Sequence, residues 1–262
     1  YVDGETIEID YQNAQGDSSA LLTISQRFVG DDCDLVLAIG TGAAQSIASQ
    51  TSEIPVLITA VTDPVDAGLV QSNEAPGTNI TGTNDMNPIR EQMELIREFL
   101  PDVQTVGLLY TSSEDNSALQ IQEVKAVLEE MNVGYVEQTV TGSNDVQQAV
   151  QSILGKCDAL YIPTDNTLAA SAALVGSAAQ TAKIPVFWGE GNCVAEGGLA
   201  SLGLDYYNLG RQTGEMAVEV LEGADPAVMP IQSQSDYSYT ISKSMAEEIE
   251  IEIPKHLLEF AE

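Results

Sequence analysis

The sequence has few basic residues and few of the residues on which most catalytic sites depend. Nine Lys and Arg stand against forty Asp and Glu, giving a formal net charge of -31, and His256 is the only histidine. This charge disfavours nucleic acid and anionic membrane surfaces as partners, because their phosphates would be repelled. A Ser-His-Asp or Cys-His catalytic arrangement would have to use His256, close to the C-terminus. The acidity itself indicates solubility, in a salty or crowded medium, rather than any particular chemistry.

Cysteine is also scarce, and its spacing excludes the usual cysteine-based frameworks. The three cysteines are Cys33, Cys157 and Cys193, with no CxxC pair among them. Neither a disulfide framework nor a zinc site is indicated, and we expect no metal and no cofactor. No apolar run approaches the roughly 18 residues of a membrane span, and no signal peptide is visible.

Nucleotide and hydrolase motifs are missing or incomplete. The stretch AIGTGAAQ follows an apolar run and places Gly40 and Gly42 like the first two glycines of a dinucleotide-binding turn. Gln45 stands at the third glycine position, and no companion acid is clear, so the match is weak. There is no GxxxxGK[ST] loop and no GxSxG elbow.

What the sequence does contain is an internal repeat. DDCDLVLAIGTGAAQS (31–46) and GKCDALYIPTDNTLAAS (155–171) each have a Cys-Asp pair, an apolar run, a Thr and an Ala-rich stretch. Each is followed by Ile-Pro-Val, at 54–56 and at 184–186. Each is also preceded by an alternating, strand-like segment and an amphipathic helical pattern. Both halves therefore predict strand, helix, strand, helix, strand.

The repeat predicts an α/β fold made of two doubly wound, Rossmann-like lobes joined by a hinge. The runs LVLAI, VLITAV, VGLLY, ALYI and VFW suit parallel strands that are buried on both faces. Alternating strands and helices with right-handed crossovers give such sheets.

The second half has an opening strand and helix, TVGLLY and the segment 116–133, with no counterpart in the first half. A lobe of this type places its first strand in the middle of the sheet, and losing it would expose apolar edges. We therefore expect the first lobe to lack its first strand and helix, and roughly 30 to 40 residues of the natural N-terminus to be absent.

Small polar residues follow the predicted strands, just ahead of helices. Capping explains part of this pattern, but ligands of doubly wound sheets also bind at the carboxyl ends of strands, beside helix N-termini. Two facing lobes with such rims predict a cleft that closes on a small polar molecule. The candidate ligand-binding residues are Thr41, Gly42, Thr62, Asp63, Asp85, Asn116, Ser117, Thr164, Asp165, Asn166, Glu190 and Asp205.

Several longer motifs resemble the substrate-binding proteins of ABC transporters of the tryptophan/tyrosine-type uptake group. They are IDYQNAQGD, AIGTGAAQ, TAVTDPVDAGLV, GTNITGTNDMNPI, PTDNT, LDYYNLGRQTGEMAVEVLEG and IEIPKHLLE, and they extend over nearly the whole chain. The resemblance implies a type I periplasmic-binding-protein fold, capture of an aromatic amino acid (Trp, Tyr or Phe), and its delivery to a permease. It further implies a monomer outside the cytoplasm, in the periplasm or lipid-anchored at the outer face of the cell membrane.

The resemblance also implies three crossings between the lobes. They are the segment 82–88, the segment LGLDYYNLG, and the tail after Gly223. On this basis residues 1–85 and about 206–226 form the first lobe. Residues 86–205 and about 227–262 form the second lobe and the tail that crosses the hinge.

An amino-acid ligand assigns roles to some of these residues. We expect Thr41, Thr62 and the backbone N–H groups near Gly42 to hold its carboxylate. We expect Asp165 to pair with its ammonium, with Asp85 and Glu190 as alternatives. The aromatic residues that could contact an aromatic side chain, or could equally build the core, are Tyr110, Tyr161, Trp188, Tyr206 and Tyr207.

Two other functions stay open at this point. The sensor domain of a receptor or regulator shares the fold, and a Rossmann-type enzyme would need a cofactor motif or a reactive dyad. Neither a motif nor a dyad is evident, so we expect no enzymatic activity.

Overall fold

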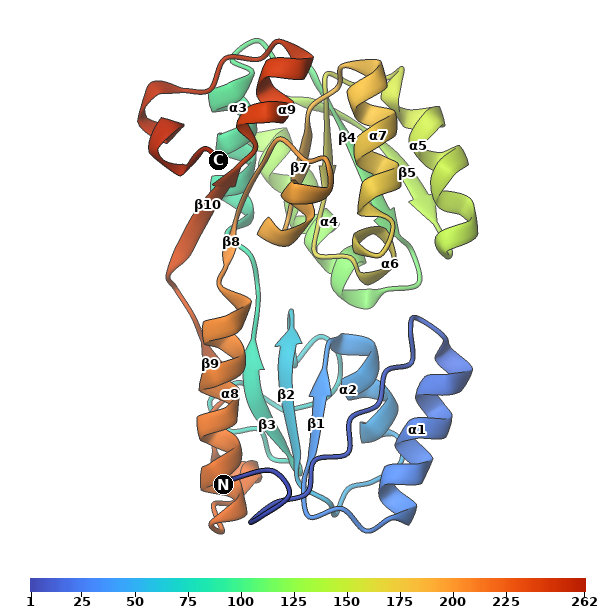
Figure 1. Cartoon of the computed structure of the whole chain (residues 1–262), viewed down its shortest axis with the longest axis vertical. Helices are drawn as coiled ribbons and strands as arrows, with labels where there is room; N and C mark the ends of the chain where they lie inside the picture. Colours follow the sequence, from blue (N-terminus) through green and yellow to red (C-terminus); the bar gives the residue numbers. More distant parts are fainter.

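The computed structural model describes residues 1–262 and contains two lobes, one above the other in Figure 1. Each lobe has its own β-sheet with helices on both faces. No helix of the chain has the length and apolar character needed to cross a membrane.

The first lobe is built on a four-stranded, wholly parallel sheet in the order β1-β2-β3-β9. Helices α1 and α2 contribute to the core on one face, and α8 packs against β2 and β3 on the other. The elements are α1 (Ser18–Gly30), β1 (Val36–Ile39), α2 (Thr41–Ala48), β2 (Val56–Val61), β3 (Ile80–Asn84), α8 (Tyr206–Leu221), η3 (Pro226–Val228) and β9 (Gln232–Ser233).

The second lobe is built on a six-stranded sheet in the order β10-β8-β7-β6-β4-β5, parallel except for β10. One core of 25 residues lies under α3, α4 and α9, and another of 18 residues under α5 and α7. The strands are β4 (Thr105–Thr111), β5 (Gly134–Val140), β6 (Ala159–Ile162), β7 (Val186–Trp188), β8 (Ala200–Leu204) and β10 (Tyr237–Ile241). The helices are α3 (Ile89–Phe99), α4 (Asp115–Glu130), η1 (Ser143–Asp145), α5 (Val146–Leu154), α6 (Asn166–Ala169), α7 (Ala172–Ala182), η2 (Gly191–Glu196), α9 (Lys243–Ile249) and η4 (Lys255–Phe260).

The repeat seen in the sequence is a repeat of structure. Strand β1 leads through α2 to its parallel neighbour β2, and β6 leads through α6 and α7 to its parallel neighbour β7. The strand order of the second lobe also follows the prediction, because its first strand, β4, lies between β5 and β6.

The strand expected near residues 7–10 does not form. This segment makes only an isolated bridge between Asp3 and Ile7, and β1 is the edge of its sheet. A strand needs a neighbour for its N–H and C=O groups, and the segment has none in this fold. The outward side chains Leu37 and Ile39 of β1 are 48% and 60% exposed for the same reason.

Three segments connect the lobes. Residues 85–88 lead from β3 to α3, Asp205 leads from β8 to α8, and residues 234–236 lead from β9 to β10. The tail therefore stays with the first lobe as far as Ser233, because β9 pairs with β3. The sequence had assigned the tail to the second lobe from about residue 227, since the two-residue strand β9 has no pattern of its own.

Backbone packing between β2 and β3 requires glycine at position 82. Gly82 has φ 143°, and a Cβ there would lie 2.0 Å from the carbonyl oxygen of Ile58. The register between these strands also shifts between Ile58 and Val61. The close approach of the two strands therefore depends on the missing side chain.

We expect Gly82→Ala to lower the free energy of unfolding by roughly 2–4 kcal/mol, because the chain must move to relieve the overlap. Gly214→Ala is the matched control: Gly214 lies exposed inside α8 with open space around it. The control should raise stability by about 0.5–1 kcal/mol, since alanine favours helix. Denaturant unfolding of both variants checks this, and equal stability for Gly82→Ala and the wild type would contradict it.

Candidate functional site at the junction of the lobes

The carboxyl ends of the parallel strands in both sheets face the junction between the lobes. Strand β3 ends where the first crossing begins, and β8 ends at the second crossing. The strands parallel to these two end at the same level, as the β1 and β2 arrowheads in Figure 1 show, and only the antiparallel β10 points the other way. The strand ends singled out in the sequence are thus brought to one region.

Asp85, in the first crossing, is the most unusual group in this region. Its side chain is almost wholly buried, at 1% exposure. Its Oδ2 accepts a hydrogen bond from the Tyr206 hydroxyl at 2.8 Å, whereas its Oδ1 has no partner. Burial raises the pKa of Asp85 from 3.8 to about 6, although the nearby hydroxyls of Tyr206 and Thr62 oppose the shift. A buried, half-paired carboxylate of this kind is costly unless a donor completes it.

A second unpaired acceptor lies two residues away, on Asn87. The Asn87 amide donates to Thr164 Oγ1 at 2.5 Å and to Gln120 Oε1 at 3.3 Å, and its own Oδ1 is buried without a partner. Gln120 also accepts from the backbone N–H of Thr164 at 3.4 Å. The first crossing is therefore joined to the ends of β6 and α4.

Glu190 brings a second carboxylate to the junction. It is half-buried after β7, and the Cys193 thiol donates to it at 2.8 Å. Its charge helps to raise the pKa of Asp85 and of Tyr206, after burial in both cases. We refer to the seven residues that these contacts bring together as the junction cluster: Thr62, Asp85, Asn87, Gln120, Thr164, Glu190 and Tyr206.

Thr41 and Gly42 form the first turn of α2, which begins at the end of β1. Thr41 is buried and Gly42 is exposed. The preceding residue, Gly40, has φ 87° and provides no side-chain cap, so side chains leave the first N–H groups of α2 unused. Helix N-termini with free N–H groups favour anions.

Asp165, our first choice for the ligand ammonium, is occupied within its own lobe. It is 3% exposed. Its oxygens accept from the N–H and the hydroxyl of Thr111, at 2.6 and 2.8 Å, and from the N–H of Leu168 at 2.9 Å. It caps α6 and ties that helix to β4. The structure therefore favours Asp85, one of the two alternatives, because Asp85 has an oxygen to spare.

Asn116 and Ser117 also act within the second lobe. The Asn116 amide and the Ser117 hydroxyl donate to the backbone carbonyl of Thr164, at 2.9 and 3.1 Å. Both residues are buried in the first turn of α4. They fix the rim that carries Thr164 rather than present free groups to a ligand.

Glu114 is a residue that the sequence analysis did not identify. Its carboxylate accepts from the N–H and side chain of Asn166, at 2.9 and 2.8 Å, and of Thr167, at 2.9 and 2.7 Å. Asn166 is thereby held at the rim, where its Oδ1 lies 3.8 Å from the place a Cβ of Gly40 would occupy in the other lobe. Glu114 immediately precedes α4 but makes no side-chain cap bond to it, so its partners lie in another segment that local sequence patterns do not indicate.

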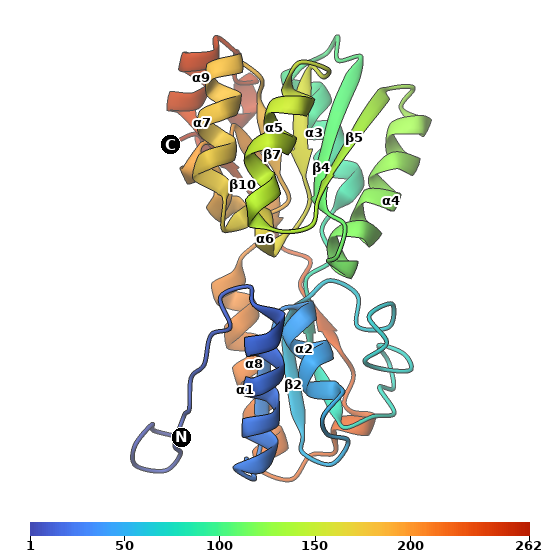
Figure 2. The same cartoon turned by 90° about the vertical axis from the view of Figure 1, so that its right-hand side faces the viewer.

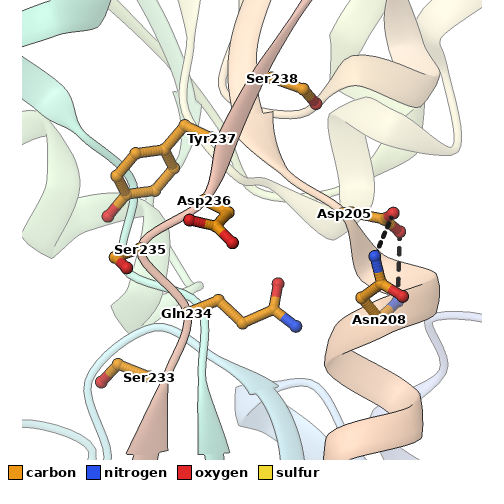
Figure 3. A pocket seen from close by; sticks show the side chains of 8 residues that line it. All are labelled: Asp205, Asn208, Ser233, Gln234, Ser235, Asp236, Tyr237 and Ser238. Carbon is orange, nitrogen blue, oxygen red and sulfur yellow. Dashed lines mark hydrogen bonds between the residues drawn. The ribbon is translucent and has the colours of Figure 1, made fainter.

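Asp63 and Asp205 serve as caps. Asp63 accepts from the N–H groups of Val65 and Asp66, and Asp205 from those of Tyr207 and Asn208. Asp205 also belongs to a separate polar pocket at the hinge, lined by Asn208 and residues 233–238. Figure 3 shows Asp205 turned toward Asn208, with Asp236 and Gln234 across the pocket. No residue of the junction cluster lines this pocket.

Of the five aromatic residues considered, only Tyr206 lies in the junction cluster. Tyr161 and Trp188 are fully buried in the two cores of the second lobe. Tyr110 donates to Glu137 beside Lys125, and Tyr207 is exposed. The sequence could not separate these roles, because each tyrosine follows or ends an apolar run.

The junction cluster offers acceptors and carboxylates, and the basic side chains lie elsewhere. Ion pairs join Arg27 to Asp10, Arg90 to Glu130, Lys183 to Glu250 and Arg211 to Glu215. No group of three His, Cys, Asp or Glu side chains is placed to hold a metal ion. The junction cluster can therefore bind a ligand that carries a positive charge or several N–H donors.

Comparisons with known proteins point in one direction. The family model for ABC transporter substrate binding proteins matches residues 1–262. A tyrosine-binding protein of Clostridioides difficile (strain R20291) is 39% identical over 252 residues, 96% of this chain and 73% of that protein.

Solved structures agree with these sequence matches. The ABC domain from Streptococcus pneumonia in complex with L-Trp is 40% identical, with a TM-score of 0.96, over 99% of this chain and 88% of that one. A ligand-free, open substrate-binding protein with adhesive properties from Clostridium difficile is 41% identical, with a TM-score of 0.72, over 97% and 86%. Solute-binding proteins below 25% identity share the type I periplasmic-binding-protein fold alone.

We expect Asp85→Asn to stabilise the ligand-free protein at neutral pH. The folded-state pKa of Asp85 lies above 3.8, at about 6. The stability that its neutral form contributes is thus complete below pH 3.8 and lost as the pH rises through about 6. The free energy of unfolding that the wild type loses in this way is about 3 kcal/mol. The variant should therefore have a melting temperature several degrees above that of the wild type at pH 8, and the same melting temperature as the wild type at about pH 4. Asp102→Asn, at an exposed position, is the control; an unchanged melting temperature for Asp85→Asn at pH 8 would refute the prediction.

Proposed function

The chain belongs to the family of ABC transporter substrate-binding proteins, and from this premise we propose that it binds an aromatic L-amino acid between its lobes. The similarity to a tyrosine-binding protein and to a complex with L-Trp supports the aromatic class. The observation that carries the proposal is the unpaired, buried Oδ1 of Asp85 at the junction.

The ammonium of the amino acid donates a hydrogen bond to the unpaired Oδ1 of Asp85. Three ammonium N–H groups can serve the Asp85 Oδ1, the Asn87 Oδ1 and a third acceptor, for which the Glu190 carboxylate is the nearest charged candidate. A positive ligand group beside Asp85 also removes the penalty of ionising this buried carboxylate. The site thus gains from the ammonium in two ways, through hydrogen bonds and through charge.

The carboxylate of the amino acid requires donors, which the first lobe offers at the start of α2. The Thr41 hydroxyl and the N–H groups of the first helical turn are suited to an anion without a basic side chain. A zwitterion held this way has its positive end at the first crossing and its negative end at α2.

The aromatic side chain of the ligand then packs on the ring of Tyr206, the one aromatic residue of the junction cluster. An aromatic contact of this kind contributes about 0.5–1.5 kcal/mol beyond burial. With the ligand held, the protein presents it to the permease of an ABC importer on the extracytoplasmic side. We propose that it acts there as a monomer, and we assign it no catalytic step.

A thermal-shift screen of the twenty amino acids tests the proposed ligand class. L-Tyr, L-Trp and L-Phe should raise the melting temperature, since a ligand at 100 times its Kd adds about 2.7 kcal/mol. Their analogues without the amino group, such as 3-(4-hydroxyphenyl)propionate, should give no shift. Stabilisation by sugars or nucleotides in place of amino acids would overturn the proposal.

The role of Asp85 is tested separately by calorimetry with the best ligand of that screen. Asp85→Asn should weaken binding by roughly 3–5 kcal/mol, the usual result of removing one partner of a buried charge pair. Wild-type affinity should also fall about fivefold between pH 6 and pH 5, as Asp85, whose pKa is about 6, is protonated. Asp102→Asn should bind normally, and full affinity in Asp85→Asn would reject the assignment.

Thr41→Val is expected to weaken binding by about 1–3 kcal/mol, because a donor to the ligand carboxylate is lost. Thr23→Val, at an exposed position in α1, should leave the affinity unchanged. Titration of both variants, with melting curves to confirm folding, decides the point. Unchanged affinity in a well-folded Thr41→Val would show that Thr41 only begins its helix.

A further inference from the structure

Away from the three crossings, one hydrogen bond joins the two lobes. Gln45 of α2 donates its Nε2 to Asp115 Oδ2, at the start of α4, at 2.9 Å. The same Nε2 lies 3.3 Å from the carbonyl oxygen of Ala67, which fixes the Gln45 side chain within the first lobe. Figure 1 places α2 at the upper rim of the first lobe, facing α4 and α6 of the second.

The two rims that Gln45 connects carry charges of the same sign. The first lobe presents Asp63 and Asp66 after β2, and the second presents Glu114, Asp115 and Glu123 on α4 and the residue before it. Asp63 of the first lobe is close enough to Glu123 of the second to help raise its pKa, after burial. Bringing the lobes together therefore brings carboxylates together, in a chain whose net charge is -31.

An uncharged hydrogen-bond donor is the kind of side chain that can join these two acidic rims. An amide at position 45 can bind the Asp115 carboxylate without adding charge, whereas a carboxylate at position 45 would repel it. In the sequence, Gln45 stands out only as the residue that breaks a dinucleotide-binding pattern. In the structure its side chain donates a hydrogen bond to Asp115, 70 residues away in the chain.

The arrangement of the lobes in this structure is close to that of the complex with L-Trp and differs more from the ligand-free, open structure. A contact such as Gln45–Asp115 depends on that arrangement, because its two residues belong to different lobes. The contact is therefore tied to the arrangement of the lobes that this structure has.

We propose that Gln45 is a positioning residue that holds the closed form through Asp115, and so sets the affinity for the ligand without touching it. This rests on the proposed function, since the contact can change an affinity only if the ligand binds between the lobes. When only a fraction of the protein is in the binding-competent form, the apparent Kd is the intrinsic Kd divided by that fraction. A change at Gln45 should therefore multiply the Kd of every ligand by the same factor.

Four variants test the proposal by calorimetry with L-Tyr and L-Trp. Gln45→Ala removes the hydrogen bond and should weaken both ligands by the same factor, roughly two- to tenfold. Gln45→Glu should weaken both further, and its effect should shrink as salt is added, because it places two carboxylates together. Gln45→Lys should bind both at least as tightly as the wild type at low salt. Asp115→Asn should weaken binding less than Gln45→Glu, because an uncharged acceptor remains.

Gln50→Glu is the matched control. Gln50 lies just after the same helix, and its side chain forms a hydrogen bond only with Ser49. It introduces the same charge without an interlobe contact, and its affinities should match the wild type. Small-angle scattering of the ligand-free variants should show Gln45→Glu more open than Gln50→Glu. Melting curves of the ligand-free proteins should be alike, because Gln45 is not part of either core.

The possible results separate this proposal from the proposed function. If the wild type binds no aromatic amino acid, the proposed function fails. If the wild type binds but Gln45→Glu and Gln50→Glu have equal affinities, the positioning role fails and the proposed function stands. If Gln45→Ala weakens one ligand and not the other, Gln45 contacts the ligand directly, and the positioning role is again overturned.

Discussion

The structure around the junction depends on one buried carboxylate that has only half of its hydrogen bonds. Asp85 lies in the first crossing and is bonded by Tyr206 from the second, so a single contact joins two of the three connections between the lobes. An ordinary core would place an apolar residue at this position, since an incompletely paired buried charge costs several kcal/mol. In the proposed function the ligand ammonium removes this cost. Ligand binding and closure of the lobes would then be coupled, because the carboxylate proposed to bind the ammonium also joins two hinge segments.

Charge explains much of the remaining architecture. In so acidic a protein, two rims that approach each other must avoid pairing carboxylate with carboxylate. The chain does this with internal bonds, such as those of Glu114 to Asn166 and Thr167, and with the neutral amide of Gln45. Five of the nine Lys and Arg residues form ion pairs, and none of these pairs includes a residue of the junction cluster. A ligand ammonium is attracted by the same potential that resists closure.

The fold could be predicted from the sequence because each helix and strand of the repeat has its own hydrophobic pattern over a short stretch of residues. The helix expected over 116–133, which the structure has as α4 (Asp115–Glu130), and the five apolar strands follow from hydrophobic spacing within short segments. The strand expected near residues 7–10 failed because a strand depends on its neighbour, and β1 has none on that side. Strand β9 was missed because two residues carry no pattern.

The candidate site was predicted only as a region. Helix and strand order showed which residues end at the junction, but an Asp whose oxygens are all paired and an Asp with a free oxygen look alike in sequence. Asp165 and Asp85 could be told apart only by their partners, three for the first and a hydroxyl 121 residues away for the second. The contacts of Glu114 and Gln45 could not be predicted for the same reason, since each is made with a segment far along the chain.

Proton release on ligand binding tests the central claim most directly. In the free protein Asp85 has a pKa of about 6, and an ammonium placed beside it must lower that value. Calorimetric titration with L-Tyr or L-Trp at pH 6, in two buffers that differ in ionisation enthalpy, counts the protons exchanged. The account predicts release of about half a proton per ligand at pH 6 and almost none at pH 8. Binding at pH 6 with no proton release, or with proton uptake, would contradict it.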